Sequence, residues 1–76
     1  MSTHHIHGEE VHFGHGTENA RVFMNKDHNK HEVERHLRDA KEGKQAVFYV
    51  EGDRFEAIAK EKDGKTIPHV ERSQRY

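Results

Sequence analysis

The sequence predicts a small α+β domain in which one helix packs on one face of a small antiparallel sheet. One amphipathic helix stands between β-prone runs, giving the order β-β-α-β-β with a further edge strand allowed after the last run. At 76 residues the chain is long enough for one domain only. Charged residues make up 36% of the chain and the apolar set only 30%, so we expect a thin core under a highly charged surface.

The helix is predicted between Asn29 and Glu42. Asn29 is a suitable N-cap, Glu32 three positions later fits a capping box, and Gly43 supplies a left-handed stop. The apolar stripe of this helix is narrow and consists of Val33, Leu37 and Ala40. Such a stripe is typical of a helix that lies on a sheet rather than in a bundle.

A hairpin of strands is predicted after the helix. The run 46–50 is continuously apolar and β-prone, and the run 54–61 alternates between polar and apolar residues. Asp63-Gly64 is a strong hairpin signal. Residues 65–67 are then expected to return as a third strand, which Pro68 would confine to a sheet edge because proline has no N–H to donate.

Two more strands are predicted before the helix, at residues 10–13 and 20–24. Residues 1–8 form a His-rich N-terminal segment, for which the sequence predicts no element and permits disorder. The single α+β domain is therefore expected to span residues 9–70. The tail 71–76 is expected to be frayed.

Composition and charge exclude several classes of protein. With 13 Lys and Arg against 14 Asp and Glu, the formal charge of −1 describes neither a polycationic nucleic-acid arm nor a strongly acidic mimic of DNA. The absence of Cys excludes a disulfide framework, a thiolate metal site and a thiol nucleophile. No signal peptide and no run long enough to cross a membrane are recognisable, so we expect a cytoplasmic protein without a membrane partner.

Nine His residues make a metal site the first chemical hypothesis. Imidazole is the commonest metal ligand and suits Zn or Ni. Glu32 and His36 share one face of the predicted helix, and His12 or His15 could complete a set of ligands. Protonation of all nine His would change the formal charge from −1 to +8, so a pH-responsive domain is a related hypothesis. The competing interpretation is that most of these side chains are ordinary solvated residues.

Basic side chains raise nucleic-acid binding as a third hypothesis, because they could neutralise phosphates. They occur in two groups, one on the predicted helix and one around the Asp63-Gly64 hairpin. The groups are Lys30, Arg35, Arg38 and Lys41, and Lys60, Lys62 and Lys65. Acidic residues are interleaved with both groups, which is typical of a solvated surface.

Catalysis is not expected, because so small a core leaves little volume for an apolar cleft and no cofactor motif is present. One face of a sheet with a single helix stays uncovered, and small scaffolds without Cys often rely on oligomerisation. We therefore expect a symmetric homodimer, formed by strand-edge pairing or by packing through Phe23, Val47, Tyr49 and Ile58.

The sequence therefore favours a small non-enzymatic binding module that docks on another macromolecule, with a protein as the expected partner and no cofactor. Small, highly charged chains without Cys are often regulators or inhibitors from phages and mobile elements, and by this association we expect such a role. A His-based metal-binding or pH-responsive domain is the alternative, and a nucleic-acid-binding domain is the third.

Overall fold

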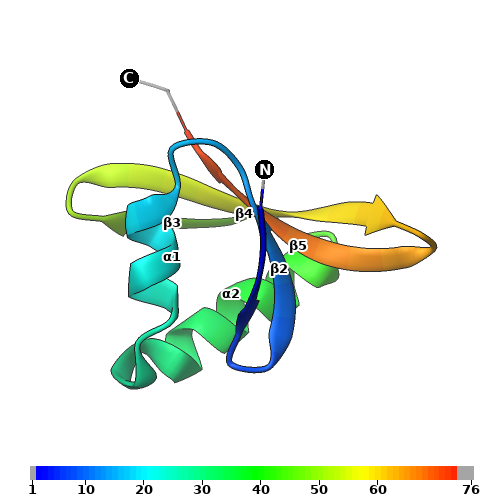
Figure 1. Cartoon of the computed structure of the whole chain (residues 1–76), viewed down its shortest axis with the longest axis horizontal. Coiled ribbons are helices and arrows are strands. Elements are labelled where there is room, and N and C mark those ends of the chain that lie inside the picture. Colours follow the sequence, from blue (N-terminus) through cyan, green and yellow to red (C-terminus); the bar gives the residue numbers. More distant parts are fainter. Residues whose placement is uncertain (1, 74–76) are drawn as a thin grey trace.

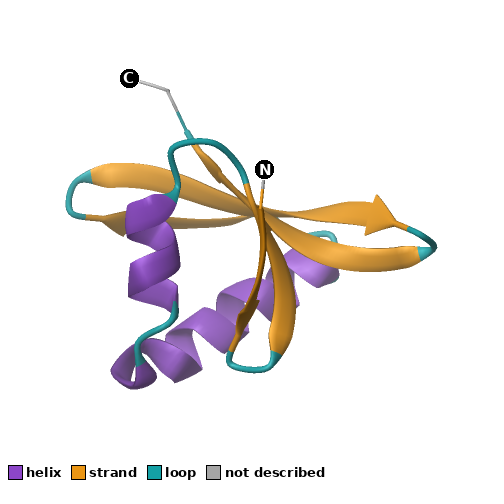
Figure 2. Cartoon of the chain, viewed as in Figure 1, coloured by secondary structure: helices purple, strands orange, loops and turns teal. Residues whose placement is uncertain are grey.

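Two helices pack on one face of a five-stranded mixed sheet in the computed structural model, which describes residues 2–73 (Figure 2). In chain order the elements are β1 (Ser2–Ile6), β2 (Glu9–Phe13), α1 (Glu18–Met24), a short 3-10 helix η1 (Asp27–Asn29), α2 (Lys30–Lys41), β3 (Ala46–Val50), β4 (Asp53–Lys62) and β5 (Lys65–Arg72). The strand order across the sheet is β1-β2-β5-β4-β3 (Figure 1). The predicted α+β class is confirmed, but the second helix and the mixed topology differ from the prediction.

The segment 20–24, predicted as a strand, lies in helix α1. Ala20 and Met24 are fully buried and Phe23 packs against the same core, which is the helical spacing of three and four. Val22 is exposed, whereas a strand would have buried it together with Ala20 and Met24. So short an apolar run fits both periods, and tertiary packing decides between them.

Strand β1 comes from the His-rich segment 1–8, for which no element was predicted. It pairs antiparallel with β2 through the two-residue turn His7-Gly8, whose φ angles of +51° and +87° are both left-handed. The turns at 51–52 and 63–64 repeat this pattern of a left-handed residue followed by a left-handed Gly. All three hairpins in the described chain thus use the same kind of tight turn.

Strand β5 lies in the middle of the sheet, antiparallel to β4 and parallel to β2. The prediction that Pro68 confines this strand to an edge is wrong for the strand as a whole. Pairing with β2 begins only at His69, so Pro68 lies where β5 has no neighbour on that side, and the missing N–H costs no ladder bond there. The strand extends to Arg72, into the segment expected to be frayed, and residues 74–76 lie outside the described residues.

Helix α2 confirms the predicted helix. It ends at Lys41, Gly43 supplies the predicted left-handed stop with a φ of +88°, and the Lys44 N–H donates to the Asp39 carbonyl in the bond typical of a Schellman ending. The predicted capping box is absent. The Asn29 side chain makes no cap and instead donates its amide to the Phe23 carbonyl at 2.8 Å, which ties α2 to α1.

The core lies between the sheet and the two helices, and the opposite face of the sheet carries no helix (Figure 2). Phe48 of β3 occupies one end of this core, where its ring stacks with Phe23, His36 and Phe55. No helix within residues 2–73 is both long enough and apolar enough to cross a membrane.

Candidate docking surface

Strand β3 is one of the two edges of the sheet, and within residues 2–73 it pairs only with β4. Its sequence, AVFYV, contains no charge, no Pro and no Gly. Natural proteins usually protect a sheet edge with charged residues, proline or bulges, because free backbone groups invite another strand. The β3 edge has none of these protections, whereas β1 at the opposite edge has the polar sequence STHHI.

The hairpin geometry shows which backbone groups of β3 point away from the sheet. The two-residue turn 51–52 is closed by the pair Val50 and Asp53, which is a hydrogen-bonded pair in such hairpins. Because hydrogen-bonded and non-hydrogen-bonded pairs alternate, the backbone groups of Phe48 also bond to β4. The N–H and C=O groups of Val47 and Tyr49 therefore point outward, along the free edge.

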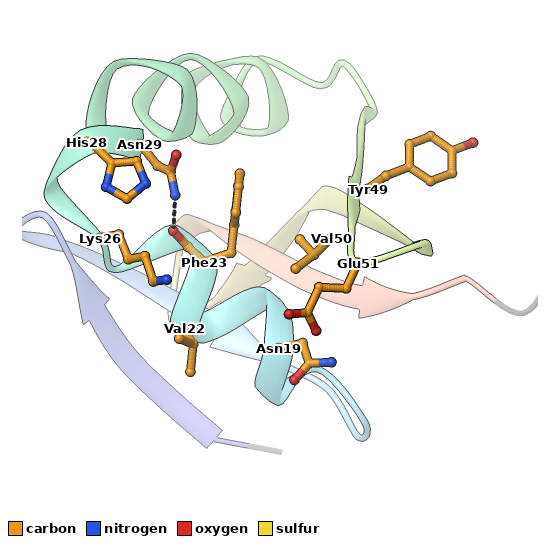
Figure 3. A pocket seen from close by; sticks show the side chains of 9 residues that line it. All are labelled: Asn19, Val22, Phe23, Lys26, His28, Asn29, Tyr49, Val50 and Glu51. Carbon is orange, nitrogen blue, oxygen red and sulfur yellow. Dashed lines mark hydrogen bonds between the residues drawn. The ribbon is translucent and has the colours of Figure 1, made fainter.

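Exposed apolar side chains gather along this edge. Within residues 2–73 the large apolar side chains that are exposed are Val22 at 50%, Val47 at 37% and Tyr49 at 65%. Val47 and Tyr49 belong to β3, and Val22 and Tyr49 both line a groove of about 320 Å³ between α1 and β3 (Figure 3). Two of the three side chains thus belong to the free edge strand itself, and Val22 lies on α1 across the groove from it.

The groove itself has an apolar floor and polar ends. The Phe23 ring stands between α1 and β3, with Val50 facing it from the strand (Figure 3). Lys26 and His28 lie toward the start of α2, while Glu51 lies at the turn that follows β3 (Figure 3). The groove therefore offers apolar contact along its length, with the Lys26 ammonium at one end and the Glu51 carboxylate at the other.

The residues predicted for an interface are divided by the sheet. Val47, Tyr49 and the half-buried Ile58 share the uncovered face, as the strand alternation requires. Phe23 lies on the helical side, packed on the core beside Phe48. Val22 was not predicted, because as a strand residue it would have pointed inward.

The uncovered face also buries two His residues where β2 meets β5. His12 and His69 are direct neighbours in the parallel register and are only 7% and 3% exposed. Each ring lies beside a carboxylate of its own strand, His12 at 3.5 Å from Glu10 and His69 at 3.2 Å from Glu71. Burial lowers the pKa of His69 below its usual 6.5, and the attraction of Glu71 only partly offsets this.

The predicted metal ligands lie on two sides of the sheet. Glu32 and His36 are 3.6 Å apart on α2, and the His36 ring stacks on Phe48 on the helical side. His12 lies on the uncovered face, and His15 is exposed in the loop after β2. Within residues 2–73 no three His, Asp or Glu side chains are arranged to hold a metal ion. The Zn or Ni site stays a prediction.

The basic residues proposed for nucleic-acid contact are also in two places. The helix group is exposed on α2, where Lys41 pairs with Glu9. Alternation along β4 and β5 points the hairpin group to the uncovered face, with Lys60 near His69. The structure does not bring the two groups together on one face, and nucleic-acid binding stays a prediction.

Comparison of the chain with models of protein families, with curated protein sequences and with solved structures found no match. The surface chemistry is therefore the basis for inferring a function.

Proposed function

We propose that this protein is a non-enzymatic binding module that docks on a protein partner by accepting an extended segment along the free edge of β3. The observation that carries the proposal is an uncharged, unprotected edge strand that itself holds two of the three exposed large apolar side chains of residues 2–73, Val47 and Tyr49. When a strand is added to a sheet edge, main-chain hydrogen bonds supply affinity and contacts with alternate side chains supply specificity.

The surroundings of β3 match both requirements. Val47 and Tyr49 offer two N–H and two C=O groups to an incoming backbone. One side chain of the incoming strand would enter the groove beside Phe23 and Val50, and the next would lie on the uncovered face beside Tyr49. The favoured ligand is therefore an extended segment rich in apolar and β-branched residues. A regulator or inhibitor is the role that we propose for so small a module.

Selection of random twelve-residue peptides on the immobilised protein tests this function. Peptides recovered on the wild type should lose affinity by at least tenfold for Tyr49→Pro, which removes an outward N–H and leaves the β3–β4 ladder intact. His5→Pro is the matched control, because the register of β1 also points the His5 N–H outward, on the opposite edge. Peptides that bind Tyr49→Pro as well as the wild type would refute docking at this edge.

A pH-responsive domain is a second candidate, favoured by the buried pair His12 and His69. These residues form one of only two register pairs between β2 and β5, the other being Phe13 and Val70. Acid would charge His69 beside the Lys60 ammonium, with the Glu71 carboxylate as its nearest opposing charge.

A further inference from the structure

We propose that the segment accepted by β3 is β3 of a second copy of this chain, paired antiparallel about a two-fold axis that passes beside Phe48. This inference rests on the proposed function, because it takes the free edge of β3 as the docking edge and names its partner. The axis would join two sheets into one continuous sheet and place both sets of helices on the same side. The observations that favour a second copy are the outward backbone groups, the side chains beside them and the charges at the two ends of β3.

The outward backbone groups of β3 are self-complementary. With the axis at Phe48, Val47 of one copy lies opposite Tyr49 of the second copy, and the reverse pair forms by symmetry. These are the two residues whose N–H and C=O groups point outward, so each opposed pair exchanges two hydrogen bonds. Four backbone hydrogen bonds therefore form without any change in the β3–β4 ladder.

The side chains beside this register are also complementary. On the uncovered face, the Val47 side chain meets the Tyr49 ring of the second copy, an aromatic and β-branched cross-strand pair of the kind that stabilises sheets. Tyr49 is the most exposed large apolar side chain of residues 2–73, and Val47 is also exposed. The symmetric contact therefore covers Val47 and Tyr49 of both copies, which are two of the three exposed large apolar side chains of residues 2–73.

The charges that flank β3 favour the antiparallel direction. Lys44 lies two residues before the strand and Glu51 directly follows it. In the two-fold arrangement, Lys44 of each copy lies opposite Gly52 of the other, one residue from Glu51, so both ends bring opposite charges near each other. A parallel arrangement would oppose Lys44 to Lys44 and Glu51 to Glu51, and like charges in such positions are unfavourable.

Sedimentation velocity over a range of protein concentrations tests the self-pairing. The wild type and the edge control His5→Pro should shift from monomer to dimer as concentration rises. Tyr49→Pro should stay monomeric at every concentration at which the wild type is mainly dimeric. Tyr49→Lys provides a second variant that keeps the strand N–H and adds an edge-protecting charge. It should stay monomeric as well, and circular dichroism confirms that each variant is folded.

The register is tested by mixing isotope-labelled and unlabelled protein. Intermolecular nuclear Overhauser effects should connect the Val47 methyl groups of one copy with the Tyr49 ring of the other. Intermolecular nuclear Overhauser effects between the β1 strands, at the edge that contains His5, would overturn the pairing through β3. A dimer that persists in both Tyr49 variants would overturn it as well.

The oligomeric state and two kinds of peptide together separate failure of this inference from failure of the docking edge. One kind is the set of peptides selected on the wild type, and the other is a peptide with the sequence of residues 44–52. If the protein is monomeric, self-pairing is wrong. Chemical-shift changes confined to β3 when any peptide selected on the wild type is added would then show that the edge still docks another protein. A wild type that is a dimer through β3 should instead bind the 44–52 peptide in competition with its own dimerisation, and no such competition would count against the proposed register.

Discussion

The His69 ring is buried on a sheet face that no helix covers, so a positive charge on the ring would lose contact with water. Its Nε2 lies 3.2 Å from the Glu71 carboxylate, which favours the charged ring, but burial opposes the charge and lowers the pKa. The adjacent His12 and the Lys60 ammonium lower it further. The neutral ring is therefore the form that the folded protein favours at neutral pH.

This shift predicts a loss of stability in mild acid. Because the folded pKa lies below the unfolded value of 6.5, the unfolded chain binds more protons as pH falls, so the full stability is present above about pH 6.5 and declines below it. Urea unfolding at several pH values should show a falling midpoint between about pH 6.5 and the folded pKa of His69.

The variant His69→Gln identifies the group responsible. It should flatten this part of the pH profile, while His31→Gln, which changes an exposed ring on α2, should leave the profile as in the wild type. An unchanged profile in His69→Gln would show that another group causes the acid sensitivity.

Asn29 differs from its prediction in a way that a mutation can measure. Its amide links α2 to α1 through the Phe23 carbonyl rather than capping α2. Asn29→Ala should lower the free energy of unfolding by about 1 kcal/mol, the usual worth of such a hydrogen bond. The Asn29→Ser variant should lose about the same free energy of unfolding, because serine is too short to reach the Phe23 carbonyl. Serine is a good helix N-cap, so this variant separates the link to α1 from capping. A serine variant as stable as the wild type would show that capping is the role of this residue.

At the scale of elements, the β1–β2 hairpin depends on its left-handed turn. Gly8 has a φ of +87°, and nothing lies within 4 Å of a Cβ placed on it, so a side chain there is opposed by the backbone conformation alone. Gly8→Ala should destabilise the protein by about 1–2 kcal/mol. If residues 1–8 were outside the fold, the substitution would change nothing.

A D-alanine in place of Gly8, introduced by chemical synthesis, is the matched control for that prediction. D-residues favour positive φ, so the protein with the D-alanine should be at least as stable as the wild type. Thermal melts of the wild type and the two alanine variants make the comparison. An equal loss of stability with L-alanine and D-alanine would show that the turn is not left-handed.

Elements with a strong local signal could be predicted from the sequence, and those fixed by distant contacts could not. The stripe of α2 and the turn at Gly64 are local, and both were found. The turn His7-Gly8 has the same left-handed geometry as Asp63-Gly64 but a weaker sequence signal, because His-Gly is not a preferred hairpin dipeptide and the run STHHI before it has one apolar residue. The segment 20–24 fits two periods equally, so its packing against Phe48 decides its form.

The candidate site was partly predictable for the same reason. Successive side chains of a strand point to opposite faces of the sheet, which is a local property. Val47 and Tyr49 were therefore correctly placed on the face opposite Phe48. The free edge of β3 depends on the order of all the strands, which no local pattern encodes. Val22 was missed because its exposure follows from the helical form of α1.

At the scale of the whole molecule, the β1–β2 hairpin joins the sheet through a short contact. Only two register pairs connect β2 with β5, whereas eight connect β4 with β5. We expect the amides of β1 and β2 to exchange with solvent through a partial opening that leaves β3, β4 and β5 paired. Native-state hydrogen exchange measures this directly, and equal opening free energies in all strands would contradict it.

The central place of β5 also sets the order in which the protein can fold while it is being made. Of the described elements, the β1–β2 hairpin leaves the ribosome before the others, and the strand that connects it to the sheet, residues 65–72, leaves after them. Until then the Val11 and Phe13 side chains have no β5 to pack beside, and the nascent chain holds two separate parts of an unfinished sheet. The sheet can therefore be completed only after β5 has been synthesised.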